Sequence, residues 1–196
     1  GFGPSLDDKA AFIAQNADVE FTGCDLGEVR TRDVLLIVRS KVRMSSCSIT
    51  GGKDQLTLAY CATQLTGLDL MGAGDDAISV KGGTLGTETL KTTGVLGSAL
   101  KLDEFAEADL VTTALQAQKD AVHVSEGAHL KMTGGSLASL SGKCLDVDPL
   151  HARHGASHVE LDGVDLGGAT APFQLGKGNT VKVNGVLQDA TAKAAP

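Results

Sequence analysis

A pair of adjacent carboxylates is the first feature of the sequence that could do chemistry. Asp75 and Asp76 lie in the stretch GDDAIS at 74–79, and Asp54 precedes Asp76 by 22 residues. Two close carboxylates can serve as general acid and as base or nucleophile in glycoside hydrolysis. Asp54, Asp75 and Asp76 are therefore one candidate catalytic group.

The same stretch also has a purely structural interpretation. Similar glycine-led corners recur in GKDQL at 52–56, GSALK at 97–101 and GKCLD at 142–146. Glycine supplies unusual backbone angles at a bend, and a short Asp or Ser side chain bonds nearby backbone N–H groups. The acid pair is then the corner of a repeating scaffold.

A second candidate group combines an ammonium, an imidazole and carboxylates. Lys101, His123 and Asp146 are 22 and 23 residues apart, so they would stack in a chain that repeats at this spacing. The catalytic candidates on this face are Lys101, His123, Asp146 and Asp148. The ligand-binding candidates around them are Lys81, Asp103, Ser125, His151, Arg153 and His154. Such a cluster could do acid–base work or hold a metal, and a solvated face of mixed charge is the alternative.

These candidates depend on a repeat that runs along nearly the whole chain. Short alternating runs such as AISVK at 77–81 and ALKLD at 99–103 recur about every 22–23 residues. Runs of a second family, such as VEFTGCDL at 19–26 and TQLTGLDL at 63–70, follow them. Alternation of period two indicates strands, and a fixed period of this size indicates a solenoid. We predict an all-β parallel β-helix of about eight coils with a period of about 22–23 residues.

Alternation sorts each coil into inward and outward positions. We expect inward columns in the first family of runs at Phe12, Leu36, Leu56, Ile78, Leu100, Val122, Leu145 and Phe173, and at Val38, Leu58, Val80, Leu102, Val124, Val147 and Leu175. Ile37 is expected to point outward. The second family is expected to close on Leu26, Ile49, Leu70, Leu96, Leu115, Leu137 and Leu166. Its outward column should be a charge ladder that fixes the register, formed by Glu20, Arg43, Gln64, Lys91, Asp109, Lys131, Glu160 and Lys182.

With these columns the chain resembles the right-handed parallel β-helix, or pectin-lyase-like, superfamily of pectate lyases, polygalacturonases, epimerases and phage tailspikes. The resemblance is architectural and covers nearly the whole chain. The Gly-Asp-Asp at 74–76 is similar to the motif of polygalacturonase-type hydrolases, whose acids flank the scissile bond. The Asn-Thr-Asp and Arg-Ile-Lys motifs of that family do not occur in this sequence. The resemblance therefore implies a right-handed coil and leaves the activity open.

Composition limits the partners. The formal net charge of −7 argues against nucleic acid or an anionic membrane as the main partner. No apolar run approaches the roughly 20 residues of a membrane span. Aromatic residues are only 3% of the chain, which leaves few platforms for stacking sugars. We expect a polysaccharide or protein partner at the cell surface and no cofactor, with Ca²⁺ a candidate only if the chain is a lyase.

The chain divides into three parts. Residues 1–16 are an N-terminal cap or the first strand, since 5–16 suits either a capping helix or a strand; residues 17–188 are the β-helix, and 189–196 a tail or linker. We expect a processed chain or a piece of a larger protein, extracellular or periplasmic. Cys24 and Cys47, 23 residues apart, should stack in a structural role as inward thiols or as a disulfide, and no cysteine spacing indicates a metal site.

Two functional hypotheses follow. The first is a non-catalytic extracytoplasmic β-helix domain that serves as a rigid scaffold or recognition surface in a larger protein. The alternative is a carbohydrate-active hydrolase, lyase or epimerase that acts on an acidic polysaccharide. An oligomerising shaft is a third option, although the charged ladder offers no apolar seam for it.

Overall fold

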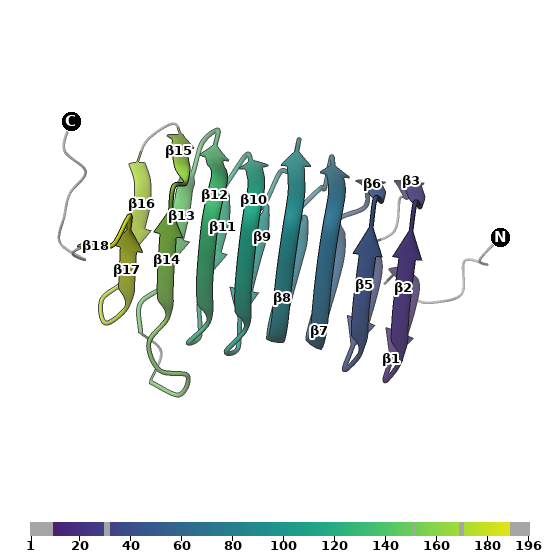
Figure 1. Ribbon diagram of the computed structural model, residues 1–196, viewed down its shortest axis with the longest axis horizontal. Helices are drawn as coiled ribbons and strands as arrows, with labels where there is room; N and C mark the ends of the chain where they lie inside the picture. The colour runs from purple at the N-terminus through teal and green to yellow at the C-terminus, as the bar shows by residue number, and fades with distance from the viewer. Residues whose placement is uncertain (1–9, 30–31, 151, 169–170, 189–196) are drawn as a thin grey trace.

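The computed structural model describes residues 10–29, 32–150, 152–168 and 171–188, which form a β-solenoid of about eight turns (Figure 1). Strands of successive turns pair in parallel, with β1 at one end of the rod and β16–β18 at the other. No helix occurs in these ranges, and so none that is long and apolar enough to cross a membrane. The predicted all-β parallel β-helix is confirmed.

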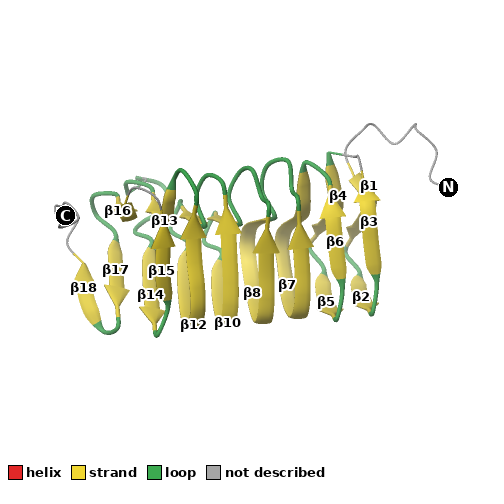
Figure 2. Ribbon diagram, turned by 90° about the horizontal axis from the view of Figure 1, so that it is seen from above, coloured by secondary structure: helices red, strands yellow, loops and turns green. Residues whose placement is uncertain are grey.

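Three faces run along the rod, each built from one strand segment per turn, except that the last described turn adds no strand to the third face (Figure 2). The first face contains β1 (Ala10–Gln15), β4 (Asp33–Val38), β9 (Leu100–Asp103), β11 (Val122–Val124), β13 (Lys143–Val147) and β16 (Ala171–Leu175). The second face contains β2 (Asp18–Thr22), β5 (Lys41–Ser45), β14 (His158–Asp162) and β17 (Thr180–Val183). The third face contains β3 (Asp25–Val29), β6 (Ser48–Gly51) and β15 (Asp165–Gly168). Four long strands cross the bends: β7 (Asp54–Met71) and β8 (Ile78–Thr93) contribute to all three faces, and β10 (Glu107–Ala117) and β12 (His129–Ser139) to the second and third.

The bend between the second and third faces has the same backbone conformation on successive turns. It is formed by Gly23, Ser46, Gly67, Thr89, Thr112, Gly134 and Gly163, with φ between 48° and 66°. A residue with a Cβ pays about 1–2 kcal/mol for this left-handed region, which explains the recurrent glycine. Thr89 and Thr112 occupy the bend on turns where the sequence lacks that signal.

The interior is aliphatic and continuous. Two inward columns of the first face follow from the strand register: Phe12, Leu35, Leu56, Ile78, Leu100, Val122, Leu145 and Phe173, and Ala14, Ile37, Leu58, Val80, Leu102, Val124, Val147 and Leu175. The members from β7 to β13 are fully buried. Stacking the turns thus buries apolar surface that a single turn would expose.

The predicted columns are wrong at β4. Leu35 and Ile37 occupy the inward positions, at 1% and 0% exposure, whereas Leu36 and Val38 occupy outward positions and are partly exposed. The run from 34 to 38 is apolar at every position, so alternation alone could not decide its parity.

The predicted third-face column is wrong at Leu96, which is 61% exposed. Thr92 takes its place below Leu70. The buried Thr92 hydroxyl donates to the Gln116 carbonyl at 3.1 Å and accepts from the Gln116 N–H at 2.9 Å, so it is satisfied by hydrogen bonds.

The predicted charge ladder is wrong at Lys91. Gly86 pairs with Gln64 in the outward column of the second face, and Lys91 lies on the third face opposite Asp69. Both errors on this turn have one cause. The bend falls at Thr89 and not at Gly94, so alignment on the Thr-Thr-Gly at 92–94 displaces the residues around it.

The two ends of the rod differ. The last described strand, β18 (Val186–Gln188), pairs with β17 in antiparallel fashion, and so covers the edge of β17 that β14 leaves open. At the other end Ala10–Gln15 forms strand β1, while residues 1–9 and 189–196, including most of the predicted cap and the predicted tail, lie outside the described residues.

All four cysteines lie in described segments and are free. Cys24 and Cys47 stack on neighbouring turns, where the Cys24 N–H donates to the Cys47 Sγ at 3.4 Å. Burial raises the pKa of the Cys61 and Cys144 thiols.

Candidate functional site

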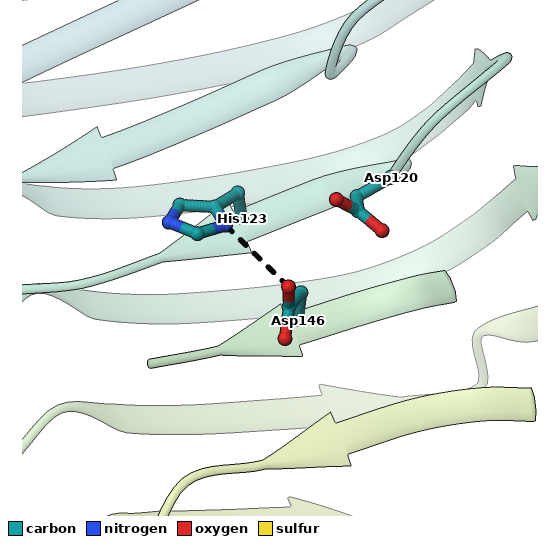
Figure 3. Close-up of side chains that lie close together, drawn as sticks. All are labelled: Asp120, His123 and Asp146. Carbon is teal, nitrogen blue, oxygen red and sulfur yellow. Dashed lines mark ion pairs between the residues drawn. The ribbon is translucent and has the colours of Figure 1, made fainter. Parts of the chain in front are cut away.

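The first face brings together the predicted cluster around His123. Strand register places Lys101, His123 and Asp146 side by side on β9, β11 and β13. The His123 Nδ1 lies 3.8 Å from Asp146 Oδ2 (Figure 3). Its Nε2 lies 3.3 Å from Asp148 Oδ2. Asp146 raises the pKa of His123 against the opposing effect of burial, and Asp148 adds to the rise. His123 in turn lowers the pKa of Asp146.

The neighbouring charges are also paired with one another. Lys101 Nζ lies 3.7 Å from Asp103 Oδ2, and the Ser125 hydroxyl donates to Asp103 Oδ1. Asp103 is 8% exposed, so this hydrogen bond satisfies a nearly buried carboxylate. Lys143 Nζ lies 3.7 Å from Asp146 Oδ2. The cluster is thus a network across turns in which each charge already has a neighbour of opposite sign.

A hollow of about 300 Å³ adjoins His123. It is lined by Lys81, Lys101, Asp103, Glu104, His123, Ser125, Glu126 and Asp148. Five of the residues predicted to bind or act there thus share its wall with His123 itself. The hollow is small and its lining almost entirely polar.

The loop that follows Asp148 contributes less than predicted. His151 lies outside the described residues, and Arg153 is exposed. His154 packs edge to face against Phe105, with ring centroids 5.4 Å apart, and its Nδ1 lies 3.8 Å from Glu126 Oε1. His154 therefore lies beside the hollow, next to one residue of its wall.

The acids of the other candidate group meet at a corner of the solenoid. Asp54, Asp75 and Asp76 bring carboxylate oxygens within 4.8 Å of one another. The Asp76 N–H donates to Asp54 Oδ1 at 3.1 Å, and the Ser98 N–H donates to Asp76 Oδ1 at 2.8 Å. Burial raises the pKa of Asp76, and the hydrogen bond from Ser98 opposes the rise.

The same corner geometry recurs further along the rod. Asp120 Oδ1 accepts a hydrogen bond from the Lys143 N–H at 3.0 Å, again from one turn to the next. Asp75 instead forms an exposed ion pair with Lys53 at 3.2 Å. Asp54, Asp76 and Asp120 each accept a backbone N–H of the next turn, as the structural interpretation of these corners predicts. The geometry therefore favours a structural role over catalysis at this corner.

Sequence reasoning missed a groove on the second face. It has a volume of about 620 Å³ and crosses the turns from β7 to β17. Its polar lining comes from two outward columns: Thr84, Glu107, His129, His158 and Thr180, and Gln64, Asp109, Lys131, Glu160 and Lys182. Gly86 occurs within the second of these columns and presents no side chain to the groove.

Polar side chains within this groove also pair with one another. The rings of His129 and His158 stack edge to face with centroids 4.9 Å apart. Lys182 Nζ lies 2.9 Å from Glu160 Oε1 and lowers the pKa of that carboxyl. The predicted ladder indicated this face, where Gly86 and not Lys91 follows Gln64 in the column, but the ladder was interpreted as fixing the register and not as part of a groove.

Two groups of side chains have the composition and proximity of metal ligands among the described residues. One is the acid corner, and the other unites Asp120, His123 and Asp146. The sequence candidates did not include Asp120. The signal for it was available, since Asp120 precedes His123 by three residues in KDAVH at 119–123.

The fold and the columns of the second face define the chain as a parallel β-solenoid with polar outer columns. Comparison with protein-family models, with curated proteins and with solved structures found no match.

Proposed function

We propose that the chain is a non-catalytic recognition module: a rigid extracytoplasmic β-helix, pectin-lyase-like in its coil, that binds an extended polysaccharide along the groove of the second face. The observation that carries the proposal is the groove of about 620 Å³ between β7 and β17. It crosses the turns, whose spacing of about 4.8 Å is close to the length of one sugar unit in an extended chain. Each turn can then offer equivalent groups to successive sugars.

The charges of the groove favour a neutral, hydroxyl-rich polymer. Asp109, Lys131, Glu160 and Lys182 alternate in sign along one column, and the last two form an ion pair. Carboxylates accept and ammonium groups donate, so such a column offers both partners that a hydroxyl needs. The cations are balanced by neighbouring carboxylates, and the net charge of −7 would repel a polyanion.

The His123 cluster supports a second candidate, the carbohydrate-active enzyme. The raised pKa of His123 suits a group that donates a proton in general acid catalysis. Lys81 and Lys101 line the same hollow and could bind the carboxylate of an acidic polysaccharide. The recognition module is preferred because both ring nitrogens of His123 already face carboxylates.

The test measures binding and turnover on the same polymers. Affinity electrophoresis against neutral glucans, mannans and galactans, and against uronic-acid polymers, should give saturable retardation with neutral polymers. The double variant His129→Ala/His158→Ala should weaken binding about tenfold or more, equivalent to about 1.4 kcal/mol. The matched control Asp69→Ala/Lys91→Ala changes an exposed register pair on the third face and should bind normally.

Turnover separates the two candidates. The same polymers are incubated with the protein with and without Ca²⁺, beside His123→Ala and Asp76→Ala variants. The recognition module predicts no cleavage, epimerisation or elimination by any of them. Turnover that disappears in His123→Ala would establish the enzyme, and equal binding by the groove variant and its control would refute the groove.

A further inference from the structure

Three side chains from two neighbouring turns converge on the first face (Figure 3). Asp120 lies just before β11, His123 is the middle residue of β11, and Asp146 lies on β13 directly opposite His123. Each offers one ligand atom, and these atoms lie within 4.8 Å of one another. Geometry, burial and the neighbouring carboxylate each bear on what this cluster can bind.

We propose that Asp120, His123 and Asp146 form a binding site for one divalent transition-metal ion, Zn²⁺ or a metal of similar ligand preference. The site goes beyond the polysaccharide groove, because it lies on a different face and would join β11 to β13. A mixed set of imidazole and carboxylates favours such metals over Ca²⁺ and Mg²⁺, which prefer oxygen ligands alone.

The separation of His123 and Asp146 fits a shared ion better than a direct bond. The 3.8 Å between Nδ1 and Oδ2 is too long for a hydrogen bond. A tetrahedral zinc ion at about 2.1 Å from each would hold the two atoms about 3.4 Å apart. The side chains therefore need to close by only a few tenths of an ångström around the ion.

Burial supplies a reason for an ion to bind. Asp120 is 3% exposed, and its Oδ1 is held by the Lys143 N–H at 3.0 Å. Asp146 Oδ1 is buried and has no hydrogen-bond partner among the described residues, and the cations nearest Oδ2 are at 3.7 and 3.8 Å. A buried carboxylate with incomplete hydrogen bonding is costly, and a bound cation would compensate its charge directly.

Asp148 is the kind of partner that a metal-binding histidine has on its second ring nitrogen. The His123 Nε2 lies 3.3 Å from Asp148 Oδ2, on the opposite side of the ring from Asp146. A histidine that ligates a metal through one nitrogen almost always donates the other N–H to a carboxylate or carbonyl. Asp148 is thus placed to accept the Nε2 proton, which would leave the Nδ1 lone pair for the ion.

One cation must move aside. Lys143 Nζ lies 3.7 Å from Asp146 Oδ2, and its side chain is 30% exposed. The long Lys143 side chain can turn toward solvent when the ion binds. The ligand set then carries two negative charges against the two positive charges of the metal.

The test uses the full chain after treatment with a chelator and dialysis. Titration calorimetry with Zn²⁺, checked by metal analysis after gel filtration, should give one ion per chain. Co²⁺ should give the visible absorption of a tetrahedral site. His123→Ala and the conservative Asp146→Asn should each lose the ion, and Asp148→Asn should weaken binding about 10–100-fold.

The matched control is the His129→Ala/His158→Ala variant, since those two neighbouring rings lie on the second face, away from Asp120, His123 and Asp146. It should retain one ion per chain at unchanged affinity. Loss of the ion in this control, or retention in both His123→Ala and Asp146→Asn when these are folded by circular dichroism, would overturn the proposal. Failure would leave the polysaccharide groove untouched, because groove binding is measured with neutral polymers and not with metal ions.

Discussion

The placement of Leu35 in the core and Leu36 on the outside gives a direct test of the strand register. The two residues are adjacent in β4, and truncation to Ala removes the same three carbon atoms from each. Leu35 is 1% exposed and lies between Phe12 and Leu56 in an inward column. Its loss leaves a cavity, which typically costs about 2–5 kcal/mol. Leu36 points outward and is partly exposed, so Leu36→Ala should cost about 1 kcal/mol.

The assay is urea unfolding of both variants, followed by far-ultraviolet circular dichroism. The midpoint of Leu35→Ala should fall well below that of the parent chain, and the midpoint of Leu36→Ala should remain close to it. The slope of the transition should be unchanged if the same surface is exposed on unfolding. Equal losses, or a larger loss for Leu36→Ala, would refute the register and restore the alternation read from the sequence.

Three further predictions concern the site and the turns. The pKa of His123 is raised above 6.5 in the folded chain, so the stability gained from its protonated ring should be complete below pH 6.5 and lost as the pH rises through the folded pKa. Urea midpoints measured in chelator should show this pH dependence, and the His123→Asn variant should lack it. Gly83→Ala would place a Cβ 2.2 Å from a backbone carbonyl oxygen and should cost more than about 2 kcal/mol, whereas Gly134→Ala meets no atom within 4 Å and should cost about 1–2 kcal/mol for its positive φ alone. Asp76→Ala removes the acceptor of a backbone N–H and should cost about 1–3 kcal/mol, but Asp75→Ala loses only an exposed ion pair, so equal thermal shifts would contradict the corner interpretation.

The repeat in the sequence was enough to predict the solenoid, because stacked turns place equivalent residues about 22–23 positions apart. The same counting correctly aligned Lys101, His123 and Asp146, since β9, β11 and β13 alternate regularly. Asp103 and Ser125, two of the predicted ligand-binding candidates, are likewise 22 residues apart and hydrogen-bonded between turns. Where every turn keeps the same length and parity, spacing in sequence translates directly into contact in space.

Prediction failed where the sequence lacks a signal for the inward positions of a strand or for the position of a bend. The apolar run of β4 gives no alternation, so Leu36 was exchanged for Leu35. On the turn that β8 forms, the bend residue is Thr89 and not a glycine, and this displaced Lys91 in the predicted alignment. The groove was not predicted because the outward column of the second face was interpreted only as a register-fixing charge ladder. Asp120 was missed as a candidate ligand because it lies before strand β11, outside the alternating run whose outward residues were compared from turn to turn.

The antiparallel strand β18 has a consequence for changing the length of the rod. Every other described pairing is parallel, so a turn inserted between existing turns would meet matching neighbours on both sides. A turn appended after β18 would meet a strand of reversed polarity, whose hydrogen bonds a parallel strand cannot continue in the same pattern. Longer variants of this rod should therefore be built by duplicating an internal turn, such as residues 78–99, with β16–β18 kept as the terminus.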